Sequence, residues 1–303
     1  MLRAMPQDPL LQQVQLLLYR DDLRGALELL DGAYARTANP VYKEHAARVR
    51  GWTEHLSSRE AYAAAYEAYY HRLKGRWRLK HLERDLRVLL GFKARKVVRH
   101  TAEDPEFQRL EREVNAFRPA RVLDAGSGEG RIALTLAARH PSIQVDAIEV
   151  SATNMRLASR MNRFSNLRFH RGFIEDAARL LPPGPVDLAY SFAVLEHVRD
   201  VDEVIAAIMA CLRPGGRFCF VVPMNEFVVD GDLPECQHDD GVAGHVRVFS
   251  ESLLRQRFGQ LPGFLLEKIP APLPTHYPAA IIPREFGAFF VAVTKPGVEI
   301  HRA

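Results

Sequence analysis

Runs rich in apolar residues alternate with helix-like segments through the second half of the chain. The strand-like runs lie at residues 121–123, 143–150, 186–190 and 217–222, and RIALTLAARH (131–140) has helical apolar spacing. Buried strands separated by helices are typical of a parallel sheet that is covered on both faces. The pattern predicts an α/β domain with a doubly wound, mostly parallel sheet.

Residues 1–117 show almost no strand pattern and predict five or six helices. A chain of 303 residues is long enough for an α/β domain and a smaller companion. We therefore expect an all-α N-terminal domain over 1–117 and the α/β domain over 118–303.

The composition mainly indicates the cellular compartment of the protein. No stretch reaches the roughly 18 consecutive apolar residues of a membrane helix, and the first ten residues lack the apolar core of a signal peptide. The cysteines, Cys211, Cys219 and Cys236, are odd in number and lack zinc-site spacing. We expect a soluble, cytoplasmic protein with no transmembrane segment. The sequence leaves its oligomeric state open.

The segment RVLDAGSGEG (121–130) is the most informative chemical feature. An apolar strand ends at Asp124, three glycines follow at alternate positions, and a helix begins directly after them. Glycine is needed where the backbone takes a positive φ or lets a ligand approach closely. A strand, a glycine turn and a helix in this order predict a nucleoside-cofactor crevice at the carboxyl edge of the sheet.

A second acid supports that interpretation. Glu149 ends the next strand, 19 residues after Gly130 (149 − 130). In nucleotide-binding α/β folds, a carboxylate about 20 residues after the glycine turn accepts the ribose hydroxyls. We expect Glu149→Ala to abolish cofactor affinity and to leave the fold intact.

The glycine spacing separates two classes of cofactor. The dinucleotide fingerprint is G-x-G-x-x-G, whereas this chain has G-x-G-x-G after an acid, with Arg131 at the third glycine position of the fingerprint. This spacing resembles motif I of the class I S-adenosylmethionine-dependent methyltransferases. NLRFHRG (166–172), VDLAYSFAVLEHV (186–198) and LRPGG (212–216) resemble later motifs of that family, in order. The resemblance covers about residues 119–223 and implies a Rossmann-like seven-stranded sheet whose last strand is antiparallel.

The resemblance also implies which residues hold S-adenosylmethionine. The expected set is Asp124, Gly126, Ser127, Gly128, Glu149, Val150, Phe173, Ile174, Ser191 and Phe192, the last two near the methionyl part. At the adenine end the family commonly has Gly-Asp, and this chain has Gly172 followed by Phe173. A phenyl ring packs on a purine face but accepts no such hydrogen bond. Phe173 is therefore either an adenine contact or a core residue, with Glu175 or Asp176 as the alternative acceptor.

Methyl transfer depends mainly on alignment, and a hydroxyl acceptor also gains from a base. The candidate bases are His197, in an LEH sequence similar to an O-methyltransferase signature, and His245. The alternative for each is a hydrogen-bonded structural histidine. Metal-dependent members read Glu-x-x-Glu-His, and here Ala193 replaces the first glutamate. We therefore expect no metal at this motif.

The segment 225–247 is long enough to form a lid. Its possible metal ligands are Cys236, His238, Asp239, Asp240 and His245. Their spacing matches no standard zinc arrangement, so we expect no metal here either.

Residues 71–100 carry eleven Lys or Arg and two acids, a local charge of +9 in a chain of net charge +4. Leucines at helical spacing make this a basic amphipathic region. It predicts either a solvated helix face or a surface for an anionic partner, namely a lipid head group, an acidic carrier or RNA. Just before it, Tyr66 and Tyr70 lie on an aromatic stripe that either packs a core or walls the acceptor pocket.

These features together predict an S-adenosylmethionine-dependent methyltransferase that acts on a hydroxyl of a small-molecule, sugar or lipid-linked acceptor. Three alternatives remain: N-methylation of a small-molecule amine, RNA methylation that uses residues 71–100, and a non-catalytic cofactor-binding interaction protein. The fourth strand does not end in the Asn/Asp-Pro-Pro-aromatic tetrad of base-amino methyltransferases. Methylation of an exocyclic base nitrogen is therefore disfavoured.

Overall fold

The computed structural model describes residues 8–19, 22–55, 58–75, 92–198, 200–224, 249–271 and 287–297. The helices are α1 (Pro9–Tyr19), α2 (Leu23–Thr37), α3 (Pro40–His55), α4 (Arg59–Gly75), α6 (Phe92–Ala102), α7 (Pro105–Phe117), α8 (Arg131–Arg139), α9 (Ala152–Met161), the 3₁₀ turn η1 (Ile174–Asp176), α10 (Ala177–Leu180), α11 (Val201–Cys211) and α12 (Glu251–Phe258). The strands are β1 (Arg121–Ala125), β2 (Gln144–Glu149), β3 (Leu167–Arg171), β4 (Val186–Phe192), β5 (Leu212–Pro223), β6 (Leu265–Pro270) and β7 (Gly287–Thr294).

The strands form one sheet in the order β3-β2-β1-β4-β5-β7-β6. β1 to β5 pair in parallel, and β7 runs antiparallel to both of its neighbours. The strand order reverses direction between β1 and β4, where a doubly wound sheet opens a crevice at its carboxyl edge. The predicted α/β class and the mostly parallel seven-stranded sheet are confirmed, with the last strand antiparallel as the resemblance implied.

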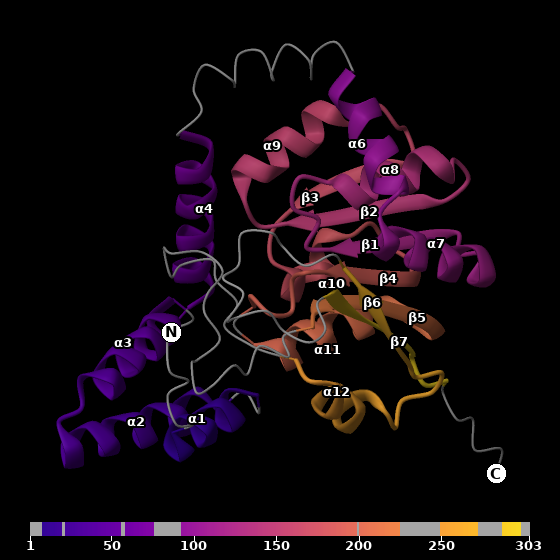
Figure 1. The fold of residues 1–303 in the computed structure, drawn as a ribbon. Coiled ribbons are helices and arrows are strands. Elements are labelled where there is room, and N and C mark those ends of the chain that lie inside the picture. The colour runs from indigo at the N-terminus through magenta and orange to yellow at the C-terminus, as the bar shows by residue number, and fades with distance from the viewer. Residues whose placement is uncertain are drawn as a thin grey trace.

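Helices cover both faces of the sheet (Figure 1). Along β1, Val122 faces one core and Leu123 the other, because successive side chains of a strand alternate between its faces. The first core packs against α6, α7, α8 and α9, and the second against α10, α11 and α12. Fully buried residues such as Leu134 and Ile208 each contribute roughly 1.5–3 kcal/mol of hydrophobic stabilisation.

The two helices before β1 belong to the sheet's core. Phe107, Leu110 and Val114 of α7 are buried among strand side chains. The Asp104 carboxylate caps α7 by accepting the Glu106 amide at 3.0 Å, and Pro105 occupies its first turn. This packing argues for a domain boundary ahead of α6, whereas the sequence suggested residue 117.

The helices α1, α2 and α3 bury a separate small core that includes Leu11, Leu30 and Val49. The next helix, α4, continues from this group and lies against α9 of the sheet domain (Figure 1). In the described part of the chain, no helix is both long enough and apolar enough to cross a membrane.

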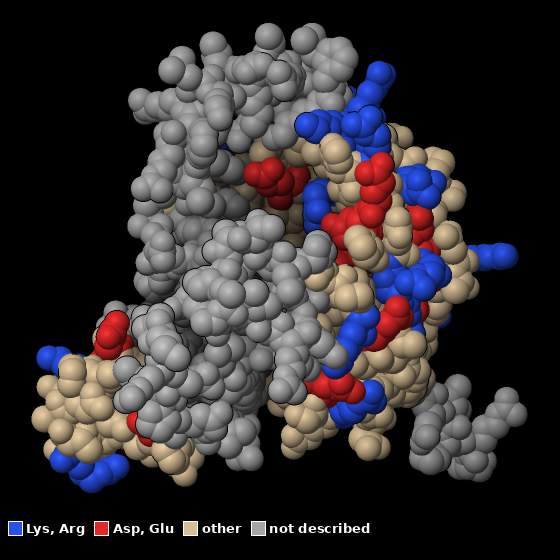
Figure 2. All heavy atoms as spheres, in the orientation of Figure 1, with Lys and Arg blue, Asp and Glu red and all other residues tan. Residues whose placement is uncertain are grey.

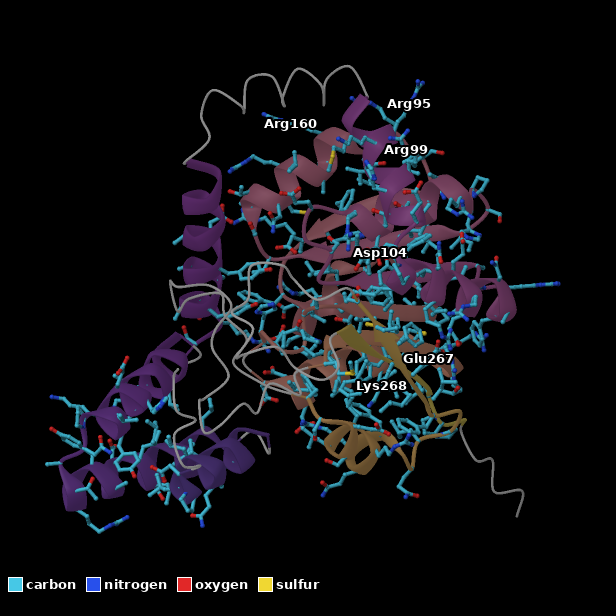
Figure 3. All side chains as sticks on the ribbon, viewed as in Figure 1. Arg95, Arg99, Asp104, Arg160, Glu267 and Lys268 are labelled. Carbon is cyan, nitrogen blue, oxygen red and sulfur yellow. The ribbon has the colours of Figure 1, made fainter. Side chains whose placement is uncertain are left out.

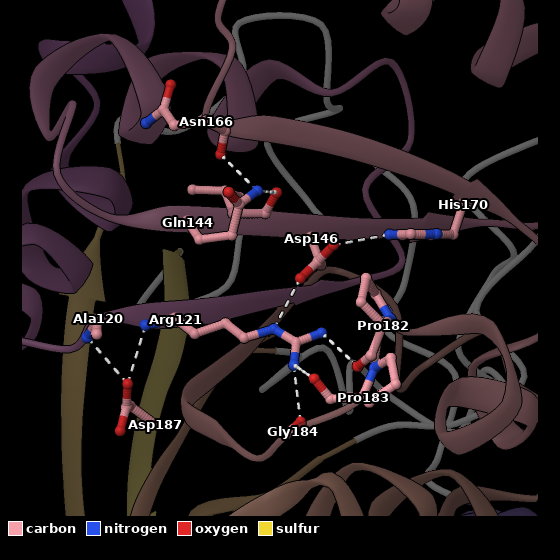
Figure 4. A network of polar contacts seen from close by, with 11 residues as sticks. Ala120, Arg121, Gln144, Asp146, Asn166, His170, Pro182, Pro183, Gly184 and Asp187 are labelled. Carbon is pink, nitrogen blue, oxygen red and sulfur yellow. Dashed lines mark hydrogen bonds and ion pairs between the residues drawn. The ribbon is translucent and has the colours of Figure 1, made fainter.

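An ion-pair network links β1, β2 and β3, and hydrogen bonds to Asp187 connect β4 with the start of β1 (Figure 4). The Arg121 guanidinium donates to Asp146 at 2.9 Å, and His170 lies 2.8 Å from the other oxygen of the same carboxylate. Burial alone would raise the pKa of Asp146, but His170 and Arg121 hold it below its ordinary value. Asp187 of β4 accepts the amides of Ala120 and Arg121. The network therefore sets the register of β1, β2 and β4, whose opposite ends form the site.

Candidate active site

The glycine turn joins the end of β1 to α8. The amides of Gly126 and Ser127 both donate to the Ile148 carbonyl of β2, at 3.0 and 2.9 Å. Gly126 has a φ of 91°, and a Cβ there would lie 2.5 Å from Val194 Cγ2. Gly128 has a φ of 54°, but a Cβ there would meet no atom within 4 Å. The turn is thus closed against β2 and Val194 and open at Gly128, where a ligand can approach the backbone.

Two adjoining pockets lie over the carboxyl ends of the strands. The β2–β3 pocket, about 570 Å³ including its mouth, is lined among others by Glu149, Val150, Phe173, Ile174 and His197. The glycine-turn pocket is lined among others by Glu106, Asp124, Ser127, Gly128 and Phe192. Gly126, Val194 and Tyr66 line both pockets, so the two meet beyond the end of β4. An elongated ligand with two chemically different ends would suit this arrangement.

Nine of the ten expected cofactor residues line one of these pockets. Ser191 is the exception, and its assignment to the methionyl end needs correction. Its side chain is fully buried, and its hydroxyl donates to the Ala125 carbonyl at 2.9 Å. Ser191 therefore fastens β4 to β1 beneath the site and does not face a pocket. Phe173 lines the β2–β3 pocket, as does Glu175.

Of the two candidate bases, only His197 lies in the described part of the chain. It borders the β2–β3 pocket, with its ring edge-on to Tyr66 at a centroid distance of 6.4 Å. Its Nε2 lies 4.0 Å from the buried Glu196 carboxylate. His245, the segment 225–247 and its possible metal ligands lie outside the described residues, as do the side chain of Tyr70 and residues 76–91.

Asp124 is a deeply buried acid at the glycine-turn pocket. It is 3% exposed, and its Oδ2 atom has no hydrogen-bond partner among the described residues. Burial raises its pKa to about 8, with the neighbouring Tyr190 hydroxyl opposing the rise and the charge of Glu149 adding to it. A donor or a cation in the pocket would satisfy this oxygen.

Glu149 binds the glycine turn to the start of α9. One carboxylate oxygen accepts the Gly128 amide at 2.8 Å, and the other accepts the Ser151 amide at 2.8 Å. Burial raises its pKa, and these two bonds work in the opposite direction. A carboxylate has about four lone-pair sites, so capacity remains for ribose hydroxyls at the β2–β3 pocket.

Helix α4 supplies part of the lining of the β2–β3 pocket, and two of its charged residues make contacts that the sequence did not indicate. Its Glu67 carboxylate accepts the Ser151 hydroxyl at 2.7 Å and also both the amide and the hydroxyl of Thr153. Its Arg59 pairs with Glu203 and lies 3.7 Å from Asp176. These partners are more than 80 residues away in sequence, and no local pattern predicts such pairs.

Two tyrosines of α4 also line the pockets. Tyr62 and Tyr66 line the β2–β3 pocket, with their rings stacked at 5.7 Å. Tyr66 also reaches the glycine-turn pocket. Tyr62 also packs against the core that α1–α3 form, so the aromatic stripe supplies both pocket wall and core contacts.

Comparison with known proteins assigns the sheet domain. The methyltransferase domain family matches residues 98–266, more than half of the chain. Trans-aconitate 2-methyltransferase of Deinococcus radiodurans is 35% identical over 106 residues, 35% of this chain and 39% of that protein. Malonyl-[acyl-carrier protein] O-methyltransferase of Laribacter hongkongensis is 34% identical over 110 residues, 34% of this chain and 37% of that protein. tRNA 5-carboxymethoxyuridine methyltransferase of Escherichia coli K12 is 39% identical over 98 residues, 32% of this chain and 37% of that protein.

The matched segments span less than two-fifths of the length of these relatives. The family match covers the glycine turn, the strands β1 to β5 and the LEH sequence. The chain belongs to the methyltransferase domain family, and its sheet domain is that of a class I S-adenosylmethionine-dependent methyltransferase.

Proposed function

We propose that this protein transfers a methyl group from S-adenosylmethionine to a hydroxyl oxygen of a small-molecule, sugar or lipid-linked acceptor, with His197 as the base. The observation that carries the proposal is the meeting of two pockets at Gly126, Val194 and Tyr66, with His197 bordering one of them. One relative named above is an O-methyltransferase, which supports an oxygen acceptor.

The side chains at the pockets fit the two ends of this cofactor. In the proposal the β2–β3 pocket holds the adenosine, with Phe173 against the base and Glu149 accepting from the ribose. The glycine-turn pocket holds the methionyl end. Among the described residues, the Oδ2 of Asp124 and the buried hydroxyl of Ser127 have no hydrogen-bond partner. Polar groups of the methionyl end would supply the partners that these buried atoms need.

When bound, S-adenosylmethionine supplies a methyl group that its sulfonium has already activated. The protein then has to orient the acceptor, exclude water and accept one proton. The imidazole of His197 would accept the proton of the acceptor hydroxyl, while the carbon–sulfur bond to the methyl group breaks and the thioether S-adenosylhomocysteine leaves. Tyr66 and Val194 line the junction of the two pockets.

The acceptor class is tested with isotopically labelled methyl transfer into cell extracts fractionated as lipid, RNA, protein and small molecules. We expect label in the small-molecule or lipid fraction, on oxygen. Label confined to RNA or protein, or label on nitrogen, would contradict the acceptor that we propose.

The role of His197 is tested by His197→Gln. With an acceptor from that screen, we expect kcat to fall about 10²- to 10⁴-fold, because a positioned base contributes that much. The dissociation constant of S-adenosylhomocysteine should change less than about twofold. His100→Gln, at an exposed position on α6, is the matched control. An unchanged kcat in His197→Gln would rule out the histidine as base.

RNA is the second candidate acceptor, because α6 carries an exposed basic surface. Arg95, Lys96 and Arg99 are exposed on α6, and Arg160 is exposed at the end of α9. Figure 3 shows Arg95, Arg99 and Arg160 at the same end of the sheet domain, and Figure 2 shows basic side chains gathered there. One relative acts on tRNA by its name. RNA binding through this surface would weaken steeply with salt, whereas salt-insensitive activity on a small acceptor would exclude it.

A further inference from the structure

Glu106 is an acid at the glycine-turn pocket that the proposed chemistry does not use. It lies in the first turn of α7, placed there by the Asp104 cap and Pro105, and its side chain lines the pocket. Among the described residues it has no hydrogen-bonded partner for its carboxylate. Burial raises the pKa of Glu106, as does the charge of Asp104, while Arg131 opposes the rise. A carboxylate in this position gains from a cation in the pocket.

The charges around the pocket are unequal. Glu106 and Asp124 are two acids that face it, and its one cation among the described lining residues is Arg131. The Arg131 guanidinium lies 3.0 Å from Asp104, outside that set, so much of its charge is already matched. Independently, the Oδ2 atom of the 3%-exposed Asp124 has no hydrogen-bond partner among the described residues. The excess of negative charge at this pocket and the unpartnered Oδ2 of Asp124 both favour a ligand group that is positively charged and donates hydrogen bonds.

We propose that Glu106, together with Asp124, binds the α-ammonium group of the methionyl end of the cofactor. The inference rests on the proposed function, because it takes S-adenosylmethionine as the ligand. The ammonium group is the part of that end which offers both a positive charge and hydrogen-bond donors. Glu106 therefore acts as a cofactor-binding residue supplied by the helix before β1, outside the glycine motif.

Three probes separate the groups that Glu106 would contact. S-adenosylhomocysteine carries the ammonium and the carboxylate, 5′-(3-aminopropylthio)-5′-deoxyadenosine carries the ammonium alone, and 5′-methylthioadenosine carries neither. Isothermal titration calorimetry of the full chain and of Glu106→Gln measures all three dissociation constants. We expect Glu106→Gln to weaken the first two about ten- to hundredfold, as for loss of a charge-assisted hydrogen bond, and 5′-methylthioadenosine less than about twofold.

The control variant is Glu103→Gln, an exposed acid three residues earlier, which should leave all three constants unchanged. If Glu106→Gln alters none of the constants, or weakens 5′-methylthioadenosine as much as the others, the ammonium assignment is wrong. If the unaltered chain binds none of the three, the proposed cofactor is wrong instead. Retained 5′-methylthioadenosine binding also shows that the variant is folded.

Discussion

Glu149 shows how one carboxylate serves both the fold and the site. Its position at the end of β2 follows from the strand pattern, and its place at a pocket follows from the topology. The two amides that it accepts, from Gly128 and Ser151, hold the glycine turn against the start of α9. Its removal is therefore expected to lower stability as well as cofactor affinity.

We predict that Glu149→Ala abolishes cofactor binding and also lowers the free energy of unfolding. The substitution takes the acceptor from two amides at a buried position, and a buried unsatisfied group costs about 1–3 kcal/mol. Glu149→Gln retains one carbonyl oxygen and should recover part of the loss. Urea unfolding of the three proteins measures the difference. An alanine variant as stable as the unaltered chain would show that the amides find other acceptors.

Glu196 predicts a pH dependence of stability. It is fully buried, both carboxylate oxygens lack hydrogen-bond partners among the described residues, and burial raises its pKa to about 8. An unfolded glutamate titrates near 4.3, so between about pH 4 and pH 8 the folded state binds more protons. Stability from this group is therefore lost as pH rises through that window.

Glu196→Gln should remove that dependence, because glutamine stays neutral. Relative to the unaltered chain, the variant should gain a few kcal/mol between pH 5 and pH 9 in urea unfolding. Asp124, whose pKa is also raised to about 8, titrates alike in both proteins and cancels in the comparison. Parallel stability profiles for the two proteins would mean that Glu196 stays ionised when folded.

Among the elements, α4 has the most contact with the site for a segment outside the sheet domain. The carboxylate of Glu67, a residue of α4, lies at the N-terminus of α9, where the helix dipole favours a negative charge. Arg59 of α4 forms ion pairs with acids of η1 and α11. Two charged contacts thus hold the helix over the β2–β3 pocket.

We predict that Glu67→Gln loosens this cover. Loss of the charge weakens the bonds from Ser151 and Thr153, so S-adenosylhomocysteine should bind about three- to tenfold more weakly, mostly through faster dissociation. Glu60→Gln, an exposed acid in the first turn of the same helix, is the matched control. Stopped-flow dissociation rates check the prediction. Equal rates for both variants would mean that Glu67 does not hold the cover in place.

Local sequence patterns predicted the helices and strands better than they predicted which elements pack against one another. The strands and the glycine turn were predictable because apolar runs and glycine spacing are local signals, and the antiparallel last strand followed from the family resemblance. The amphipathic pattern of α7 shows that it buries a face but not which core receives Phe107, so the boundary was placed at residue 117. At Ser191 the strand end was correctly located, but sequence does not show whether a hydroxyl faces a ligand or a neighbouring carbonyl.

At the scale of the whole molecule, the chain has a sheet domain with two cores and a helical group with its own core. α1 to α3 pack on one another, whereas α4 contributes to the pockets. Among the described residues of the N-terminal region, α4 therefore lines the site, whereas α1–α3 do not.

Two truncations test this division. Removal of residues 1–57 should leave S-adenosylhomocysteine affinity within about threefold, because the pocket residues Arg59, Tyr62 and Tyr66 remain. Removal of residues 1–91 should weaken binding by at least about tenfold while the sheet domain, with α6 and α7 intact, still unfolds cooperatively. Calorimetry and thermal unfolding of both shortened chains give the comparison. Equal affinity in the two would show that the pocket does not need the helical cover.

The position of α4 over the pocket has a kinetic consequence. In the function that we propose, S-adenosylhomocysteine would lie beneath α4, and its release would require that helix to move. We therefore expect product release to set an upper limit on kcat. Any binding event that pulls on α1–α3 would change that limit without touching the reacting atoms. A partner that binds α1–α3 would thereby regulate the turnover rate.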